Sequence, residues 1–180
     1  MSALAKIALE HACAAPQAAA SFALSAAAAS MLAGAWFFEL VLGIAPCPLC
    51  LYQRIPYYIV VPLGLAVGVL ALKASRLRLA RGGLALIAVL LSVGAGIGLY
   101  HAGIEWSWWQ GPASCAGGGL TAPAGDILTA LRQSSVVRCD EAPWRFLGLS
   151  LAGYNALIAG GLALIAIVAA RAQGSSSVSQ

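Results

Sequence analysis

Charged side chains are scarce in this sequence, and that scarcity excludes an ordinary soluble domain. Lysine, arginine, aspartate and glutamate make up 9% of the 180 residues, and hydrophobic residues make up 61%. Soluble domains typically carry about 25% charged residues. We therefore expect the folded chain to be surrounded by membrane lipid, and we expect no nucleic-acid partner.

Histidine is also rare, and the sequence has no arrangement typical of a bound metal or haem. Only two histidines are present, and neither completes a familiar zinc pattern with the closely spaced pair Cys47 and Cys50. Cys115 and Cys139 lie too far apart to be the second pair of a zinc ribbon. Leu51 occupies the position at which a haem-attachment motif needs histidine. We expect no metal site.

Four apolar runs are long enough to cross a bilayer, which takes about 20 residues in a helix. The expected spans cover approximately residues 18–45, 55–72, 82–101 and 146–170. We expect the first run to be an uncleaved span and not a removable signal peptide. The sequence thus predicts an all-α integral membrane protein. Its single domain, residues 1–172, is expected to be a four-helix transmembrane bundle, and residues 173–180 are expected to form a disordered tail.

Basic residues in the link between the second and third spans predict the orientation of the chain. This link contains no acidic residue and several basic ones: Lys73, Arg76, Arg78 and Arg81. By the positive-inside rule the link is cytoplasmic. Both chain termini are then cytoplasmic, and the loops at residues 46–54 and 102–145 face the opposite side. The longer loop exceeds what a turn needs, and its middle, residues 124–137, is predicted to form a short helix on the membrane surface.

Small residues recur at four-residue spacing in two of the spans. Gly94 and Gly98 belong to the third span, and Ala156 and Gly160 belong to the fourth. Such spacing lets helix backbones approach closely, so we expect these positions to pack within the bundle.

Most of the cysteines fall on the non-cytoplasmic side, because the first and third loops of a four-span protein share one side. These cysteines are Cys47, Cys50, Cys115 and Cys139. Disulfides persist there if the compartment is oxidising. Cys13 falls on the other side and is expected to be an inert thiol.

The close spacing of Cys47 and Cys50 favours redox chemistry over structural clamping. A disulfide that closes so short a loop removes little entropy from the unfolded chain. Cys50 is expected near the start of the second helix, where free N–H groups favour a thiolate. Arg54, four residues later on the same helical face, is expected to stabilise that anion. Structural clamping alone would account for Cys115 and Cys139.

A thiolate at the membrane boundary is well placed to reduce a lipid-soluble quinone, which accepts the two electrons released when a dithiol closes. Arg54 would stabilise negative charge on a quinone oxygen. His101, at the outer end of the third span, is a candidate hydrogen-bond donor to the ring; an interfacial histidine with no special role is the equal alternative. Glu39 is costly inside a span, and we assign it no role.

Two motifs and the four spans resemble the bacterial disulfide bond formation protein B (DsbB) family. The motifs are Cys47-Pro-Leu-Cys50-Leu-Tyr-Gln-Arg54 and Arg138-Cys139-Asp-Glu-Ala-Pro-Trp144-Arg-Phe-Leu-Gly148. The resemblance covers most of the chain. It implies a multi-pass protein of the bacterial inner membrane with its cysteine loops in the periplasm. It also implies a quinone-dependent oxidoreductase that reoxidises a periplasmic thioredoxin-like dithiol oxidase and so sustains disulfide bond formation.

The same resemblance implies a role for each cysteine. The position matching Cys115 is attacked by the thiolate of the reduced oxidase, and the position matching Cys139 helps to pass the electrons onward. Cys47 and Cys50 then deliver them to ubiquinone or menaquinone, with Cys50 facing the quinone beside Arg54.

Two alternatives stay open at this point. A vitamin K epoxide reductase-like enzyme uses similar parts, although its Cys-x-x-Cys motif comes late in the chain, whereas here it comes first. A non-enzymatic four-span protein would use the cysteines only as stabilising loop disulfides.

Overall fold

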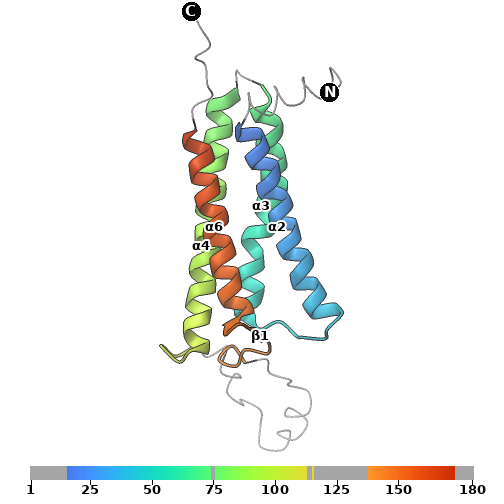
Figure 1. Ribbon diagram of the computed structural model, residues 1–180, viewed down its shortest axis with the longest axis vertical. Coiled ribbons are helices and arrows are strands. Elements are labelled where there is room, and N and C mark those ends of the chain that lie inside the picture. Colours follow the sequence, from blue (N-terminus) through green and yellow to red (C-terminus); the bar gives the residue numbers. More distant parts are fainter. Residues whose placement is uncertain (1–15, 74–75, 113–114, 116–137, 173–180) are drawn as a thin grey trace, which may run out of the picture.

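A computed structural model describes residues 16–73, 76–112, 115 and 138–172 of the chain. Within this part, four helices are long and apolar enough to span a membrane: α2 (Pro16–Leu40), α3 (Pro48–Ala71), α4 (Leu77–Glu105) and α6 (Leu151–Arg171). They lie lengthwise against one another as one bundle (Figure 1). The predicted four-helix membrane fold is therefore confirmed.

The two ends of the bundle differ in what they hold. The start of α2 and the end of α6 lie at one end, and strand β1 (Arg145–Phe146) lies at the other (Figure 1). At the first end, the Gln17 side-chain amide and the Arg81 guanidinium both donate to the Ala172 carbonyl, at 2.7 and 3.1 Å. These bonds tie together the ends of α2, α4 and α6.

The other end holds the cysteines. Cys47, Cys50, Cys115 and Cys139 belong to one cluster there, together with Leu49 and Ile104. The prediction that these four cysteines share one side of the bundle is confirmed.

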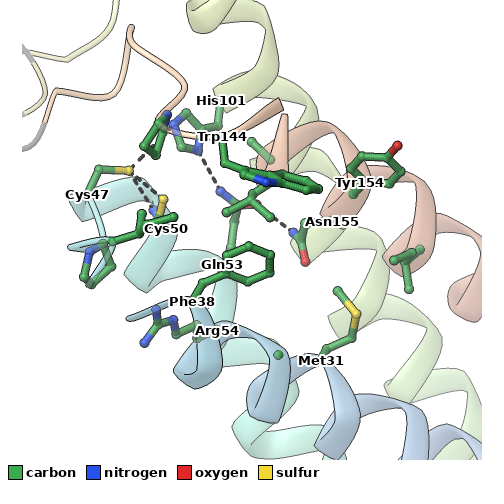
Figure 2. A pocket seen from close by; sticks show the side chains of 18 of the residues that line it. Met31, Phe38, Cys47, Cys50, Gln53, Arg54, His101, Trp144, Tyr154 and Asn155 are labelled. Carbon is green, nitrogen blue, oxygen red and sulfur yellow. Dashed lines mark hydrogen bonds between the residues drawn. The ribbon is translucent and has the colours of Figure 1, made fainter. Parts of the chain in front are cut away.

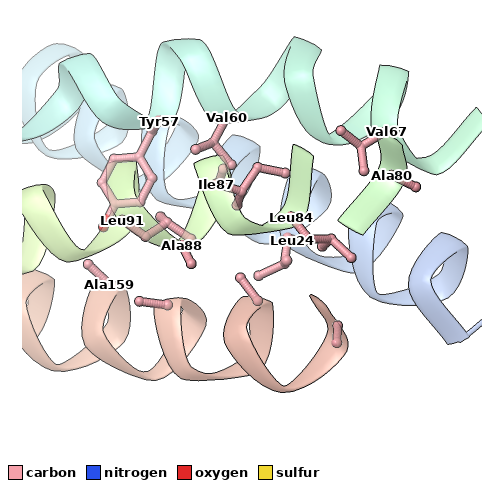
Figure 3. Packing of buried hydrophobic residues seen from close by; sticks show 14 of the residues in the cluster. Leu24, Tyr57, Val60, Val67, Ala80, Leu84, Ile87, Ala88, Leu91 and Ala159 are labelled. Carbon is pink, nitrogen blue, oxygen red and sulfur yellow. The ribbon is translucent and has the colours of Figure 1, made fainter. Parts of the chain in front are cut away.

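The core between the helices consists of aliphatic and small side chains (Figure 3). Leu84, Ile87 and Leu91 of α4 are fully buried against Leu24 of α2 and Val60 of α3. Burial of a large aliphatic side chain in a close-packed core is sensitive to changes in volume, which fixes how the helices sit against one another.

Small residues let α4 approach two neighbours, as the four-residue spacing predicts. A Cβ added at Gly98 would lie 3.0 Å from the backbone nitrogen of Ala156 in α6. A Cβ added at Gly94 would lie 3.3 Å from the ring of Pro56 in α3. The backbone of α4 therefore comes close to both helices near the end that holds the cysteines.

Helix α3 begins earlier than the expected span, and this difference brings the dithiol motif into the helix. Pro48 occupies the first turn, where its missing N–H costs nothing. Cys47 is the N-cap, and its sulfur accepts the backbone N–H of Cys50 at 3.2 Å. Cys50 and Arg54 both lie in the helix, as expected from their placement near its start and on one helical face, although the span was expected to begin at residue 55.

Helix α6 begins later than the expected start at residue 146, because a short hairpin precedes it. Strand β1 pairs antiparallel with β2 (Leu149–Ser150). Leu147 and Gly148 make the two-residue turn with φ angles of 49° and 83°, as a tight hairpin requires. Ser150 then caps the helix by accepting the Gly153 N–H at 3.1 Å.

Several expectations concern residues outside the described part of the chain. They are the surface helix at residues 124–137, the inert thiol of Cys13 and the tail at residues 173–180.

Candidate redox site

The dithiol pair lies at the N-terminus of α3. The sulfurs of Cys47 and Cys50 are 2.8 Å apart and share a hydrogen bond. Cys47 is buried, whereas Cys50 is partly exposed. The two sulfurs lie within reach of each other, as the predicted redox pair requires.

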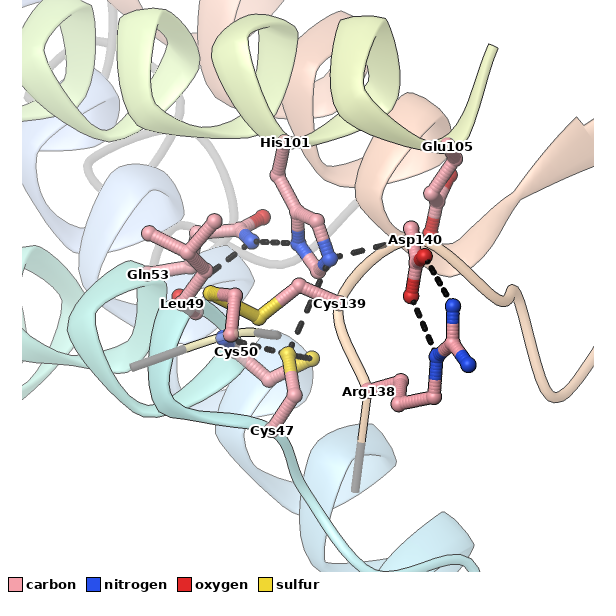
Figure 4. Close-up of a disulfide and its surroundings, with 10 residues drawn as sticks. Cys47, Leu49, Cys50, Gln53, His101, Glu105, Arg138, Cys139 and Asp140 are labelled. Carbon is pink, nitrogen blue, oxygen red and sulfur yellow. Dashed lines mark hydrogen bonds and ion pairs between the residues drawn. A yellow bond between two sulfur atoms is a disulfide. The ribbon is translucent and has the colours of Figure 1, made fainter. Parts of the chain in front are cut away.

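The second pair, Cys115 and Cys139, forms a disulfide with both residues buried. It packs on Cys47, Leu49 and Ile104, so both pairs lie in one cluster. Figure 4 shows the sulfurs of Cys47, Cys50 and Cys139 gathered beside the His101 ring. The two cysteine pairs, which are far apart in the sequence, are therefore brought together at one end of the bundle.

His101 lies at the centre of this cluster and is 3% exposed. Its Nε2 is 3.7 Å from the Cys47 sulfur and 3.8 Å from a Glu105 carboxylate oxygen. Its Nδ1 is 2.9 Å from the side-chain nitrogen of Gln53. The residue was expected at the outer end of a span; α4 continues past it to Glu105, and both ring nitrogens have partners inside the protein.

A chain of buried polar side chains continues from His101 into the bundle, and the sequence did not lead us to expect it. Asn155 donates its amide N–H to the Gln53 carbonyl oxygen at 2.7 Å. The Tyr57 hydroxyl donates to the Asn155 carbonyl oxygen at 2.6 Å. This chain joins α3, α4 and α6. Buried polar groups need such partners, because an unpaired one costs about 1–3 kcal/mol.

The guanidinium of Arg54 pairs with the carboxylate of Glu39 across α3 and α2. The side chains are 12% and 32% exposed, so the pair is shielded from water on the arginine side. Glu39, to which the sequence assigned no role, therefore has an identified partner. Stabilisation of the Cys50 thiolate by Arg54 stays a prediction.

A pocket of about 410 Å³ lies beside the dithiol. Residues of α2, α3, α4 and α6 line it, and Figure 2 shows Phe38 and Trp144 facing into the same space as the labelled polar residues. The ring centroids of Phe38 and Trp144 are 5.4 Å apart. The pocket is also lined by residues that the sequence predicted for the site: Cys47, Cys50, Arg54 and His101.

The surroundings of Cys47 favour its thiolate. The hydrogen bond shared with Cys50 is the largest effect that lowers the pKa of Cys47, and the nearby His101 lowers it further, whereas burial acts in the opposite direction. The N-terminus of α3 adds the backbone N–H of Cys50, which donates to the Cys47 sulfur, and the positive end of the helix dipole. The sequence placed this helix-terminus effect at Cys50; the structure places it at the N-cap, Cys47.

The charges that flank Cys139 neutralise each other. Arg138 donates to both carboxylate oxygens of Asp140, and this pairing lowers the pKa of Asp140. Cys139 therefore lies beside an internally paired arginine and aspartate, and its reactivity is not dominated by either charge.

The missed residues share one signal, a polar side chain inside an apolar span. Gln53 of α3 and Asn155 of α6 fit that description, as does Glu39, whose cost inside a span the sequence already indicated. A polar group at such depth is costly unless it has a partner or a function. Sequence alone marks them as unusual but does not say which residues they contact.

The chain is similar to a described family over most of its length. The sequence model of the family described as "Disulfide bond formation protein DsbB" matches residues 17–169. No solved structure matches the chain.

Curated proteins named "Disulfide bond formation protein B" resemble the chain as well. The protein from Xanthomonas oryzae pv. oryzae (strain MAFF 311018) is 32% identical over 151 residues, which cover 79% of this chain and 84% of the relative. The protein from Marinobacter nauticus is 36% identical over 140 residues, covering 72% and 77%. The protein from Polaromonas sp. (strain JS666) is 30% identical over 149 residues, covering 81% and 85%. With its spanning helices and paired cysteines, the chain belongs to the DsbB family of membrane proteins for disulfide bond formation.

Proposed function

We propose that this protein reoxidises a periplasmic thioredoxin-like dithiol oxidase and passes the electrons through its two cysteine pairs to a quinone in the bacterial inner membrane. This proposal is supported above all by the position of the Cys115–Cys139 disulfide. It packs on Cys47 in one buried cluster, beside a pocket within the bundle. A pair of merely structural disulfides needs neither this contact nor the pocket.

The first exchange takes place at the Cys115–Cys139 disulfide. A thiolate of the reduced oxidase attacks Cys115, the bond to Cys139 breaks, and Cys139 leaves as a thiolate. Attack by the second thiol of the oxidase then releases Cys115. The oxidase is left with a disulfide, and two electrons with their protons have moved to Cys115 and Cys139.

The second exchange moves the electrons to the dithiol at α3. Cys139 and Cys47 are members of one cluster, so a reduced Cys139 has the Cys47–Cys50 disulfide as its neighbour. The Cys139 thiolate attacks the Cys50 sulfur, and the bond to Cys47 breaks. Attack by Cys115 on Cys139 then re-forms the Cys115–Cys139 disulfide and releases Cys50, so that Cys47 and Cys50 are left as thiols. Cys47 suits the position of a leaving thiol, because a lowered pKa speeds departure.

The pocket residues fit a flat, mostly apolar ligand with polar oxygens. A pocket of about 410 Å³ falls in the range of small-molecule sites, roughly 300–1,000 Å³. Phe38 and Trp144 offer ring faces for stacking. Arg54 supplies a positive charge at the wall, and Cys50 is the more exposed member of the dithiol. A bound quinone would supply an acceptor for two electrons and two protons.

The orientation proposed here follows from charge. The end of α3 and the start of α4, which the basic residues flank, lie at the end of the bundle opposite strand β1 and the cysteine cluster. With that end in the cytoplasm, the cluster faces the periplasm, where the oxidase is found.

The experiment is a turnover assay with purified protein in detergent. Short-chain ubiquinone and an excess of reduced thioredoxin-like periplasmic oxidase are mixed with the protein, and the loss of quinone absorbance is followed. We expect catalytic turnover in the unaltered protein and none in Cys115→Ser. Cys13→Ser is the matched control, since it removes a thiol from outside the proposed relay and should leave turnover unchanged.

The outcomes separate the alternatives. Turnover that persists in Cys115→Ser would overturn the proposed point of attack. Failure of the folded protein to turn over with ubiquinone and also with menaquinone would overturn the quinone proposal and favour structural loop disulfides. Those disulfides would then resist a mild thiol reductant, whereas relay disulfides exchange rapidly.

A further inference from the structure

The orientation of the Gln53 side-chain amide is fixed by a backbone group. The nitrogen of this amide lies 3.3 Å from the carbonyl oxygen of Leu49, one helical turn earlier. A flipped amide would set its oxygen against that carbonyl oxygen, and two acceptors repel each other. The other side of the amide agrees, because its oxygen accepts the Asn155 N–H at 2.7 Å.

The fixed amide determines which nitrogen of His101 carries the proton. A Gln53 N–H points at Nδ1 from 2.9 Å, so Nδ1 must be the acceptor. In a neutral imidazole the proton then resides on Nε2.

The groups around Nε2 lead independently to the same result. Two acceptors lie near Nε2: the Cys47 sulfur at 3.7 Å and a Glu105 carboxylate oxygen at 3.8 Å. An unprotonated Nε2 would face both acceptors with no hydrogen to offer them. A donor faces Nδ1 and acceptors face Nε2, so both sides of the ring select one tautomer.

Asn155 and Tyr57 extend the chain of hydrogen bonds that ends at His101. The Tyr57 hydroxyl donates to Asn155, which donates to Gln53, which donates to His101. Every bond of this chain runs in the same direction, and the Gln53 amide uses its second N–H for the Leu49 carbonyl. Side-chain amides are poor carriers of protons, so this chain is suited to orienting the imidazole and not to conducting a proton through it.

We infer that Gln53 and Asn155 are positioning residues that hold neutral His101 in its Nε2–H tautomer, with the N–H directed at the sulfur of Cys47. His101 thereby stabilises the Cys47 thiolate when the Cys47–Cys50 bond opens. The tautomer follows from the hydrogen bonds alone, whereas its effect on turnover rests on the function proposed above.

The Nε2–H tautomer of His101 also disfavours the binding of a metal ion at this cluster. One sulfur from each of Cys47 and Cys50 and one ring nitrogen of His101 lie within 4.8 Å of one another, which is close enough to hold an ion. A metal takes an unprotonated nitrogen. The nitrogen that faces the sulfurs is the one the network keeps protonated, so a metal would first have to break the bond from Gln53.

The test reads the tautomer directly by nuclear magnetic resonance. The chain has two histidines, so ¹⁵N-histidine labelling gives two imidazoles, and a His11→Gln variant assigns the signals of His101. Spectra of the oxidised protein in micelles are recorded at about pH 8.5, well above the ordinary histidine pKa of about 6.5. We expect proton coupling at Nε2 and an unprotonated Nδ1. A dominant Nδ1–H tautomer would overturn the inference.

Variants then test the positioning role. Gln53→Glu preserves shape but can only accept, so it should draw the proton to Nδ1. Asn155→Leu leaves the Gln53 oxygen without its donor and should give a mixture of tautomers. Gln17→Glu makes the same chemical change at the opposite end of the bundle and should leave the His101 spectrum unchanged. A spectrum unaffected by Gln53→Glu would remove Gln53 from the role.

A kinetic measurement separates positioning from general damage. Gln53 also lines the pocket, so in Gln53→Leu we expect kcat for quinone reduction to fall about tenfold and by a larger factor than KM for the quinone rises, because the sulfur chemistry is impaired beyond the binding. An unfolded variant would lose its melting transition as well. If the unaltered protein failed to reduce any quinone, the function proposed above would be wrong. The ¹⁵N measurement would still decide, independently, which tautomer His101 adopts.

Discussion

The sulfur of Cys47 accepts the backbone N–H of Cys50 at 3.2 Å, so one member of the dithiol caps the helix whose first turn carries the other. This relationship divides the pair into two unlike thiols. Cys47 is buried, receives the N–H of the helix terminus and lies near His101, whereas Cys50 is partly exposed at the pocket.

That division predicts a thiolate at Cys47 near neutral pH. A lowered pKa means that the anion persists as the pH falls, until the pH reaches the pKa in the folded protein. In a reduced Cys13→Ser, Cys115→Ser, Cys139→Ser protein, thiolate absorbance in the ultraviolet should stay constant from about pH 8 to about pH 6, whereas an ordinary thiol with a pKa of about 8.5 loses it across that range.

The control for this titration is the same protein with Cys47→Ser added. With the Cys47 thiol removed, the absorbance that persists to about pH 6 should disappear. Equal titrations of the two proteins would contradict the assignment of the thiolate to Cys47.

The ion pair between Arg54 and Glu39 allows the role of the arginine to be separated from the role of the pair. Arg54→Met removes the positive charge at the pocket wall and should raise the KM for quinone about tenfold, corresponding to about 1.4 kcal/mol. Glu39→Gln breaks the same ion pair but leaves the charge, so KM should change little. Steady-state kinetics with a short-chain ubiquinone measure both variants.

Equal effects of the two substitutions on KM would mean that the ion pair shapes the pocket and that the charge itself does not meet the ligand. The melting temperature of each variant shows whether a change in KM comes from a loss of stability. Removing one partner of a shielded ion pair also destabilises the fold.

The aromatic walls give a third prediction. Trp144 stands with Phe38 at the pocket, with 5.4 Å between ring centroids, and stacks on Phe146 of the hairpin. Trp144→Ala removes a ring face and should weaken quinone binding about two- to tenfold, the effect of losing one stacking contact of about 0.5–1.5 kcal/mol. Trp108→Ala, at a residue that is 61% exposed, is the matched control and should leave KM unchanged. Equal KM values for the two variants would argue against a ligand in this pocket.

The sequence was enough to predict the spans and the close packing at Gly98, because both depend on local composition. It also predicted the shared side of the cysteines, because two spans separate the loops that carry them. It did not predict the polar chain from His101 to Tyr57. The bonded residues are 48 to 102 positions apart along the chain, and no local pattern pairs them.

The start of α3 and the hairpin were missed for a different reason. Apolar runs locate the lipid-facing part of a helix, whereas its ends are set by caps and turns. The N-cap at Cys47 depends on one hydrogen bond, and the turn at Gly148 depends on a positive φ angle. A hydropathy profile contains no information on either feature.

Two glycines two residues apart in α4 provide the last prediction. Both Gly98→Ala and Gly96→Ala should gain up to about 1 kcal/mol of helix propensity. At Gly96 the new Cβ meets nothing within 4 Å, so this variant should melt at the same temperature or higher. At Gly98 the Cβ would lie 3.0 and 3.1 Å from backbone atoms of α6, which cannot move aside as a flexible side chain would. Overpacking of this kind costs about 1–3 kcal/mol, so the melting temperature should fall.

The same Cβ at position 98 would lie 3.1 Å from the Asn155 amide nitrogen, the atom that donates to Gln53. Gly98→Ala should therefore lower quinone reduction as well as stability, and it should loosen the tautomer of His101 in the ¹⁵N spectrum. Gly96→Ala should do neither. If Gly98→Ala lowered the melting temperature and left the His101 spectrum unchanged, the close contact of α4 with α6 would serve packing only. Loss of both would mean that the approach of these two helices also holds the polar chain in register with the cysteines.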